Sequence, residues 1–256
     1  MNRSGIKGVD YAINPYTGCG HSCKYCYARF MTRWVHQGEE WGSFVDAKLN
    51  AVECLKNEAP RKRRGVVLLS SVTDPYQPAE KIYKITREIL GVLCDYDFPV
   101  QILTKSSLIT RDLDVITEIE EMEVGLTITC MNDSVRRAFE PGASTIYERL
   151  EALRVINEVG IPTYAFLGPL LPFLSEDGLG ELLSLLADRV NRVIVDRLNI
   201  KAGNWLPINR TLERYNPQII PRFKEAAAEG SAYYEGLKRD LIIQLYKRAI
   251  PFDILF

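Results

Sequence analysis

A chain of 256 residues and 29.1 kDa is long enough to bury a substantial core in one large domain or two small ones. Its 46% hydrophobic and 25% charged residues are typical of a soluble globular protein, and no stretch approaches the roughly 18 apolar residues of a membrane span. The net charge of −1 gives no overall basic footprint for nucleic acid. Six cysteines in this length do not indicate a disulfide framework, and the first residues contain no apolar signal sequence, so we expect a cytoplasmic protein.

Short β-branched runs alternate with amphipathic segments along most of the chain, which predicts repeated βα units. A first strand is expected over Tyr11–Tyr16, followed by a loop rich in cysteine and by a helix that starts near Tyr25. The further strands are predicted at Val66–Ser70, Val100–Thr104, Gly125–Thr129, Thr163–Gly168 and Arg192–Leu198. The helices between them are predicted at Glu80–Leu93, Asp112–Glu121, Thr145–Val159 and Asp177–Ala187.

Two of these helices have additional sequence support. Apolar residues of the first recur at spacings of three and four, at Ile82, Ile85, Ile89 and Leu93, which predicts one stripe facing a sheet. The third opens on Thr145 and Glu148, the pattern of a capping box.

Six βα units are fewer than the eight of a closed TIM barrel, so we expect an α/β fold, a partial (β/α)6 barrel, over residues 1–200. Residues 201–256 break the alternation. Trp205-Leu-Pro is typical of a loop, and helices are predicted near Pro217–Glu229 and Tyr233–Ala249. We interpret this part as a helical C-terminal extension packed on the core. The basic run Arg61–Arg64 precedes a strand and is expected to be a solvated turn at the bottom of the barrel.

Cys19, Cys23 and Cys26 form the pattern C-x3-C-x2-C within Asn-Pro-Tyr-Thr-Gly-Cys-Gly-His-Ser-Cys-Lys-Tyr-Cys-Tyr. Three thiolates are one fewer than a four-iron cluster can accept. A cluster held by three cysteines keeps one iron free for another ligand, as a catalytic zinc keeps an open coordination position.

A structural zinc site is the alternative for these cysteines. Zinc takes four ligands, usually from two separated pairs, and this chain has no second pair. His21 could be the fourth ligand, but it lies inside the first gap of the motif. With zinc or with a closed cluster, the chain would be a metal-stabilised binding module rather than an enzyme.

Polar residues follow three of the predicted strands, where a parallel barrel binds its ligands. Ser70, Ser71, Thr73 and Asp74 follow the second strand, and Lys105 follows the third. On the fourth strand, alternation places Thr127 and Thr129 on one face. Beyond it, Glu140 could order the loop, and Arg149 could form an ion pair or reach a ligand.

The cysteine motif, with Tyr25 before its last cysteine, resembles the signature of the radical S-adenosylmethionine (SAM) superfamily. Further matches, at Thr-Asp-Pro-Tyr-Gln-Pro-Ala-Glu, Thr-Lys-Ser and Phe-Glu-Pro-Gly-Ala-Ser, make residues 10–200 similar to the spore photoproduct lyase-like family. The resemblance implies a partial barrel with a 4Fe-4S cluster on Cys19, Cys23 and Cys26. It also implies that the free iron chelates SAM, which is cleaved to a 5′-deoxyadenosyl radical that abstracts hydrogen from a substrate.

The resemblance also assigns expected SAM contacts. The strand end at Ser70, Ser71, Thr73 and Asp74 would receive the SAM amino group, although the Gly-Gly-Glu motif common there is absent. Lys105 would pair with the SAM carboxylate, and Arg149 would reach SAM. Thr127 and Thr129 would meet its ribose or carboxylate, with polar packing inside the barrel as the alternative. Tyr25 would contribute beside the cluster, and the strand at Leu167 would pack its backbone against adenine.

The substrate is not implied by these motifs. Repair of a DNA pyrimidine photoproduct is the alternative function, but we match the lyase's hydrogen-donating cysteine to Ser71, whose O–H bond is too strong for that step. Cys130 or a tyrosine such as Tyr76 would have to replace it. Only 18 residues precede Cys19, which leaves no room for the lyase's N-terminal domain. The expected partners are an unknown substrate and an electron donor such as ferredoxin or flavodoxin, with no membrane.

Overall fold

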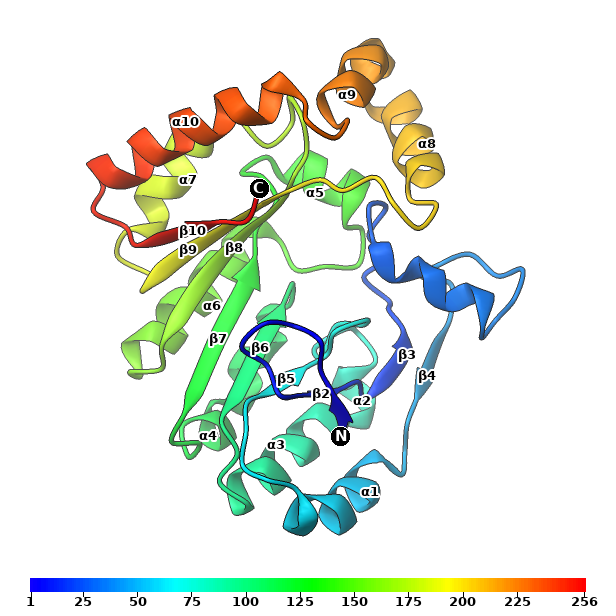
Figure 1. Cartoon of the computed structure of the whole chain (residues 1–256), viewed down its shortest axis with the longest axis vertical. Coiled ribbons are helices and arrows are strands. Elements are labelled where there is room, and N and C mark those ends of the chain that lie inside the picture. Colours follow the sequence, from blue (N-terminus) through cyan, green and yellow to red (C-terminus); the bar gives the residue numbers. More distant parts are fainter.

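A parallel sheet organises the computed structural model, which describes residues 1–256 (Figure 1). Seven strands run parallel, in the order in which they occur along the chain. They are β2 (Tyr11–Ile13), β5 (Val67–Leu69), β6 (Val100–Thr104), β7 (Met122–Thr127), β8 (Thr163–Leu170), β9 (Arg192–Arg197) and β10 (Phe252–Ile254). The short β1 (Asn2–Arg3) adds antiparallel to β2, and β1 and β10 do not pair with each other, so the barrel is open. The predicted α/β partial barrel is confirmed.

Helices cover the outer face of the sheet, as expected of βα units (Figure 1). Those of the barrel are α1 (Ala51–Glu58), α2 (Glu80–Tyr83), α3 (Ile85–Asp95), α4 (Leu113–Ile116), α5 (Asp133–Phe139), α6 (Ile146–Glu158) and α7 (Leu179–Leu186). The later ones are α8 (Trp205–Tyr215), α9 (Ile220–Ala226) and α10 (Ala232–Lys247). Short 3-10 turns are η1 (Tyr27–Arg33), η2 (Ala59–Arg61), η3 (Ser107–Asp112) and η4 (Pro217–Ile219). None of the helices has the length and apolar composition that crossing a membrane requires.

The main core lies between the outward side chains of the strands and these helices. It contains 44 buried residues, including Val67, Ile102, Val124 and Leu167 from successive strands. Since the outward positions of the strands are filled by this core, the inward positions are left to line the inside of the barrel.

The predicted helix Glu80–Leu93 is broken in the structure. Lys84 adopts a left-handed conformation, with φ of 52°, and separates α2 from α3. Ile85, Ile89 and Leu93 of the predicted stripe are buried, whereas Ile82 is 77% exposed. The capping box of Thr145 and Glu148, by contrast, is present at the start of α6.

Several other elements differ from the prediction. The predicted first strand is split at Pro15 into β2 and β3 (Tyr16–Gly18), and β3 pairs with the unpredicted β4 (Val45–Ala47). Helices α1 and α5 were not predicted, and α4 ends at Ile116, well before Glu121. Trp205-Leu-Pro opens α8 instead of a loop, because Pro207 lies in the first turn, where a helix needs no backbone N–H donor.

The segment after residue 200 contains the expected helices and also a strand. β10 extends the core sheet through its parallel pairing with β9, so this extension is not helical throughout. Helices α8 and α9 lie beside the cysteine loop and α5, whereas α10 lies across the sheet near β9 (Figure 1). The division into a core of residues 1–200 and an extension of 201–256 stays a prediction.

Candidate active site

The three cysteines of the motif lie in the loop between β3 and η1, and none of them forms a disulfide. Cys19 and Cys23 are buried and Cys26 is half-buried. All three line one cavity of about 890 Å³, which extends along the inside of the barrel. The cavity is therefore large enough for a ligand of the size that proteins usually bind in clefts.

The same cavity collects polar residues from neighbouring strand ends. These residues were expected at the mouth of the barrel, and the structure brings six of them together. They are Ser70, Ser71, Thr73, Asp74, Lys105 and Thr127.

The three thiols are electrostatically unfavourable as thiolates without a partner. Burial raises the pKa of each, that of Cys23 to about 12 in spite of the nearby Lys105 ammonium. A metal centre supplies the missing positive charge, because a coordinated thiol is deprotonated outright. Buried, unbridged thiols of this kind fit a metal cofactor.

The arrangement of the thiols is not that of ligands around a single ion. No three His, Cys, Asp or Glu side chains of the chain converge in that way. Cysteines of an iron–sulfur cluster bind separate irons, so they need not meet at one point. His21, the alternative fourth ligand, is buried with its Nδ1 atom 3.3 Å from Oδ2 of Asp74. The donor set therefore fits an iron–sulfur cluster.

Lys105 presents a charged group to the cavity. Its ammonium has no carboxylate within ion-pair distance and lies 5.8 Å from the centre of the Tyr25 ring. Burial alone would lower the pKa of Lys105, but the charges of Cys23 and Glu140 outweigh it and raise the pKa. The ammonium therefore stays protonated and is free to bind an anionic group.

Ser70 is the second unsatisfied group. It follows β5 with a φ of 70°, a left-handed conformation that is costly for a residue other than glycine. Its hydroxyl oxygen is buried and has no hydrogen-bond partner. Since buried polar atoms are rarely left without a partner, this hydroxyl points to a ligand in the cavity.

The neighbours of Ser70 are already engaged. Ser71 is held by Asn14, whose Oδ1 accepts from the Ser71 backbone N–H at 2.9 Å and whose Nδ2 donates to its hydroxyl at 3.2 Å. The Thr73 hydroxyl donates to the carbonyl of Gly18 and accepts from Nε2 of Gln77 at 2.9 Å. These contacts tie the end of β5 to the start of the cysteine loop.

Asp74 is saturated in the same way. Its carboxylate accepts from the Tyr76 backbone N–H at 2.9 Å, from the Thr104 hydroxyl at 2.6 Å and from the Lys105 backbone N–H at 2.9 Å. Burial would raise its pKa, but His21 and Thr104 hold the pKa of Asp74 at about 2. Asp74 thus orders the strand ends and has little capacity left for a ligand.

Tyr25, Thr129 and Arg149 do not line the cavity; they form a buried network beneath the cysteine loop around Glu140. The Glu140 carboxylate accepts from the hydroxyls of Tyr25 and Thr129 and pairs with Nη2 of Arg149 at 2.5 Å. Arg149 also donates to the carbonyl of Thr127 at 2.8 Å. Of the two roles considered for Arg149, the structure has the ion pair.

Three other predicted site residues lie outside the cavity. Tyr76 is fully buried in the main core, and the Cys130 thiol is 1% exposed and contacts the carbonyl of Asn132 at 3.3 Å. The Leu167 side chain faces the outer core, and Phe166 lines the cavity instead.

Several cavity residues were missed by the sequence reasoning. Tyr27, directly after the last cysteine, donates its hydroxyl to the carbonyl of Ser71. At the other end of the cavity, Arg192 pairs with Glu123 at 2.7 Å and lies 5.1 Å from the Tyr164 ring centre. Glu123, Tyr164 and Arg192 occupy inward positions of β7, β8 and β9. Strand alternation extended toward the strand starts would therefore have found them.

Residues 13–186 match the Radical SAM superfamily. The chain belongs to this superfamily. Its members are enzymes that use SAM and a 4Fe-4S cluster, which agrees with the thiols and the free ammonium described above. A relative from Methanocaldococcus jannaschii, an uncharacterized protein, is 36% identical over 233 residues, which cover 91% of this chain and 85% of the relative.

Two further radical SAM proteins extend the comparison. The radical SAM Nα-GlyT isomerase of Pseudomonas phage M6 is 23% identical over 224 residues, covering 85% of this chain and 46% of that protein. A spore photoproduct lyase mutant with bound AdoMet and dinucleoside spore photoproduct superimposes with a TM-score of 0.69 at 16% identity, covering 100% of this chain and 79% of the lyase. The radical SAM fold of this chain is thus of the spore photoproduct lyase type.

Proposed function

We propose that this radical SAM enzyme holds a 4Fe-4S cluster on Cys19, Cys23 and Cys26 and acts on a substrate that is still to be identified. When bound, the cluster and SAM supply a 5′-deoxyadenosyl radical that abstracts hydrogen from the substrate. The protein's part is to bind SAM, orient it and keep water away from it.

One observation carries this proposal. Three thiols without a disulfide, two buried and one half-buried, line the same cavity as an ammonium that has no carboxylate partner. A structural metal site would not need a free cation beside it. The carboxylate of SAM, in contrast, needs a positive group such as the Lys105 ammonium to bind it.

The SAM contacts follow from which groups are free. Lys105 would bind the carboxylate, and the Ser70 hydroxyl would accept from the amino group. Thr127 and Ser71 line the cavity beside them and would complete the contact. Thr73 and Asp74 would act by ordering the strand ends rather than by touching SAM. A contact between adenine and the backbone at Leu167 stays a prediction.

The substrate is left open, and a dinucleoside photoproduct is the first one to test. The fold of spore photoproduct lyase supports that choice. However, no cysteine lines the cavity except the three assigned to the cluster, so a thiol return of hydrogen like that expected in the lyase has no donor in this cavity. An electron donor such as ferredoxin or flavodoxin and a cytoplasmic location are also proposals.

Anaerobic reconstitution with iron and sulfide, followed by reduction and addition of SAM, tests the proposal. We expect about four irons per chain and formation of 5′-deoxyadenosine. Alanine at Cys19, Cys23 or Cys26 should abolish both, whereas Cys54→Ala and Cys94→Ala, which change thiols on α1 and α3, should not. Bound zinc in place of iron would overturn the proposal.

A second variant tests the SAM contact. Lys105→Gln should retain iron but weaken SAM binding by about 10- to 100-fold, because a hydrogen bond between charged groups is lost. Equilibrium binding of SAM to the reconstituted protein measures this. Unchanged affinity would remove Lys105 from the proposed site.

A further inference from the structure

The charge of the chain is unevenly distributed around the cysteine loop. Residues 20–40, which contain the loop and η1, and residues 199–226, which contain α8 and α9, together carry eight Lys and Arg but only four Glu. These two segments therefore have a net charge of +4 in a chain with a net charge of −1, and all other residues together carry −5.

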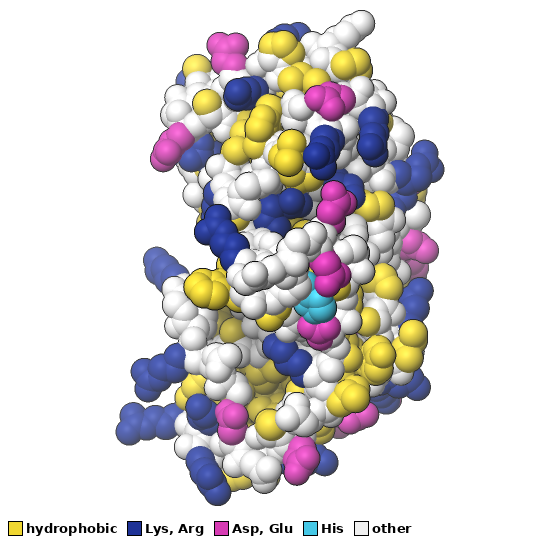
Figure 2. Space-filling model, turned by 90° about the vertical axis from the view of Figure 1, so that its right-hand side faces the viewer, with side chains coloured by type: hydrophobic (Ala, Val, Ile, Leu, Met, Phe, Trp, Pro, Cys, Tyr) yellow, Lys and Arg dark blue, Asp and Glu magenta, His cyan; other side chains and the backbone are white.

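The two segments lie side by side. Nδ2 of Asn204 donates to the carbonyl of Tyr25 at 2.9 Å, and Arg210 is 3.6 Å from Glu40. Lys201 of the α8 segment lies 5.5 Å from the ring centre of Tyr27, the residue after Cys26. We call this surface over η1 and α8 the basic face. Figure 2 shows its Lys and Arg side chains together with acidic ones, which lie beside the histidine, where His36 binds Glu39 and Asp46.

Three of the four acidic residues of these segments have a partner, whereas several of the basic residues have no acidic one. Glu39 binds His36, Glu40 binds Arg210, and Glu213 accepts from Asn209. The side chains of three exposed basic residues, by contrast, have no carboxylate partner. They are Arg33, Lys201 and Arg214.

An exposed tryptophan accompanies these charges. Trp34 follows η1 directly and is 77% exposed. Exposed Trp beside Arg is typical of protein–protein interfaces, where these two residue types dominate the binding energy. Cys26, the least buried cysteine of the motif, lies just beneath, since Arg29 of η1 donates to its carbonyl at 3.1 Å.

We propose that the basic face is the docking surface for an acidic protein that carries single electrons. This rests on the proposed function, because cleavage of SAM consumes one electron that must enter through the cluster. A positive face over the cysteines would steer an acidic carrier to the surface nearest the cluster, where the distance for electron transfer is short. It would also speed association at low ionic strength. The net negative charge of the rest of the chain would disfavour docking elsewhere.

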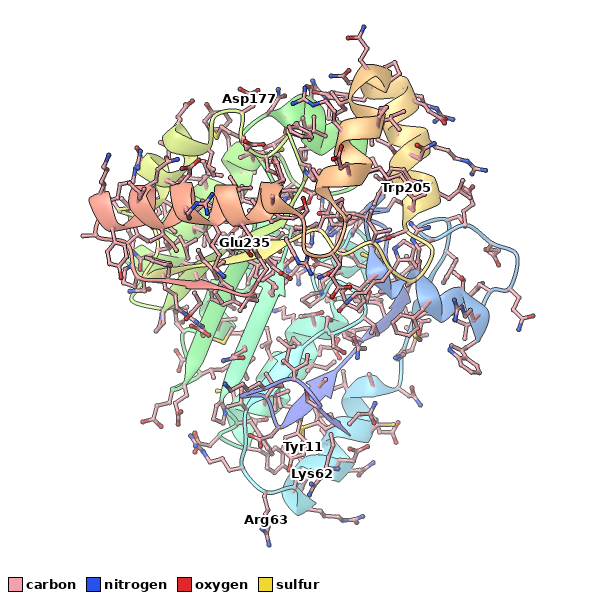
Figure 3. All side chains as sticks on the ribbon, turned by 45° about the horizontal axis from the view of Figure 1, so that its top comes forward. Tyr11, Lys62, Arg63, Asp177, Trp205 and Glu235 are labelled. Carbon is pink, nitrogen blue, oxygen red and sulfur yellow. The ribbon has the colours of Figure 1, made fainter.

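Charge reversal separates docking from cluster chemistry. The Arg33→Glu/Lys201→Glu variant changes two exposed residues that do not line the cavity. The control, Arg61→Glu/Arg63→Glu, makes the same change in charge in the exposed basic run at the far end of the barrel. Figure 3 shows Arg63 there, away from Trp205 of α8. Both reconstituted proteins are reduced by a flavodoxin hydroquinone or by dithionite and followed by stopped-flow absorbance.

We expect the Arg33→Glu/Lys201→Glu variant to be reduced by flavodoxin about tenfold more slowly than the wild type at low ionic strength. The difference should disappear near 1 M salt, and dithionite should reduce all three proteins at the same rate. The charge-conserving variant Arg33→Lys/Lys201→Arg should be reduced by flavodoxin at the wild-type rate. An equal loss in the control, or no loss in either, overturns the docking surface.

The result is separable from the proposed function. If no iron–sulfur cluster forms in the wild type, the proposed function fails before docking is measured. If the cluster forms and dithionite reduces it, only the docking proposal is at stake. Loss of oligonucleotide binding in the reversed variant, with an unchanged flavodoxin rate, would overturn docking and assign the face to nucleic acid.

Discussion

Glu80 and Glu140 are both fully buried, and each binds an arginine and a tyrosine, but they stabilise different parts of the molecule. Glu80 accepts from the hydroxyl of Tyr16, pairs with Nη2 of Arg111 at 2.9 Å and accepts from the Thr86 backbone N–H at 3.0 Å. These partners join β3, α3 and η3, which are parts of the scaffold.

Glu140 uses the same chemistry beneath the cysteine loop. Its tyrosine, Tyr25, lies between Cys23 and Cys26, and its arginine, Arg149, lies on α6. A buried ion pair contributes little net stability, because the cost of removing two charges from water offsets their attraction. What such a pair does provide is a fixed geometry. The ion pair of Glu140 therefore fixes the geometry of the cysteine loop, which would hold the cluster.

Glu140→Gln and Glu80→Gln are the strongest test of this difference. Glu140→Gln leaves Arg149 buried without its charge partner, so it should lower the free energy of unfolding of the iron-free protein by about 3 to 5 kcal/mol. Glu80→Gln should cost less, because Arg111 is partly exposed and keeps a second carboxylate partner, Asp112, at 2.7 Å. Urea denaturation measures this. Only Glu140→Gln should in addition speed alkylation of Cys23 in the folded protein severalfold and reduce the iron bound on reconstitution.

The two variants control for each other. Global unfolding exposes Cys23 in each variant to the extent that its measured free energy of unfolding sets, so alkylation of Glu140→Gln beyond that extent reports local loosening of the loop. Alkylation that global unfolding fully explains in both variants would show that Glu140 is merely a second scaffold residue.

Much of the fold could be predicted because its signals are local. β6 was predicted at Val100–Thr104 and has those bounds, since a β-branched run is bounded there by Pro99 and a polar turn. The start of α6 was marked by its capping box. β10 could not be predicted in this way, because a three-residue strand exists only where the edge of β9 is available to pair with it.

The site residues show the same difference between local signals, which could be predicted, and long-range contacts, which could not. The spacing of the cysteines is local and indicated a cluster. Whether Arg149 binds a ligand or a carboxylate depends on the position of Glu140, and whether Asp74 is free depends on Thr104 and Lys105. These contacts join residues 9 to 31 positions apart, so only the folded chain decides between the alternatives.

The stability that Glu140 contributes should depend on pH. Burial would raise the pKa of Glu140, but Arg149 and Lys105 lower it from 4.5 to about 2. The stability that the charged form contributes is therefore fully present above about pH 4.5 and is lost as the pH falls through about 2. We expect the difference in unfolding free energy between wild type and Glu140→Gln to shrink over this range, as measured by denaturant titrations. A difference that does not change with pH would contradict a charged Glu140.

The smallest expected effect comes from the contact between the cysteine loop and the loop after α5. Gly142 donates its backbone N–H to the carbonyl of His21 at 3.1 Å, and a Cβ atom at Gly142 would lie 2.2 Å from the carbonyl oxygen of Gly20. Gly142→Ala must therefore push the cysteine loop away from the Glu140 network, at a cost of about 1 to 3 kcal/mol in unfolding free energy.

Gly91→Ala is the matched control, because a Cβ atom at Gly91 in α3 would have no atom within 4 Å. That variant should gain about 0.5 to 1 kcal/mol from the better helix propensity of alanine and bind a full complement of iron. Gly142→Ala should bind less iron than its modest loss of stability explains, when both variants are reconstituted at a temperature where they are fully folded. Full iron binding by Gly142→Ala would mean that the cysteine loop keeps its geometry without close packing on residues 139–145, and that the hydroxyl of Tyr25 alone is enough to hold it.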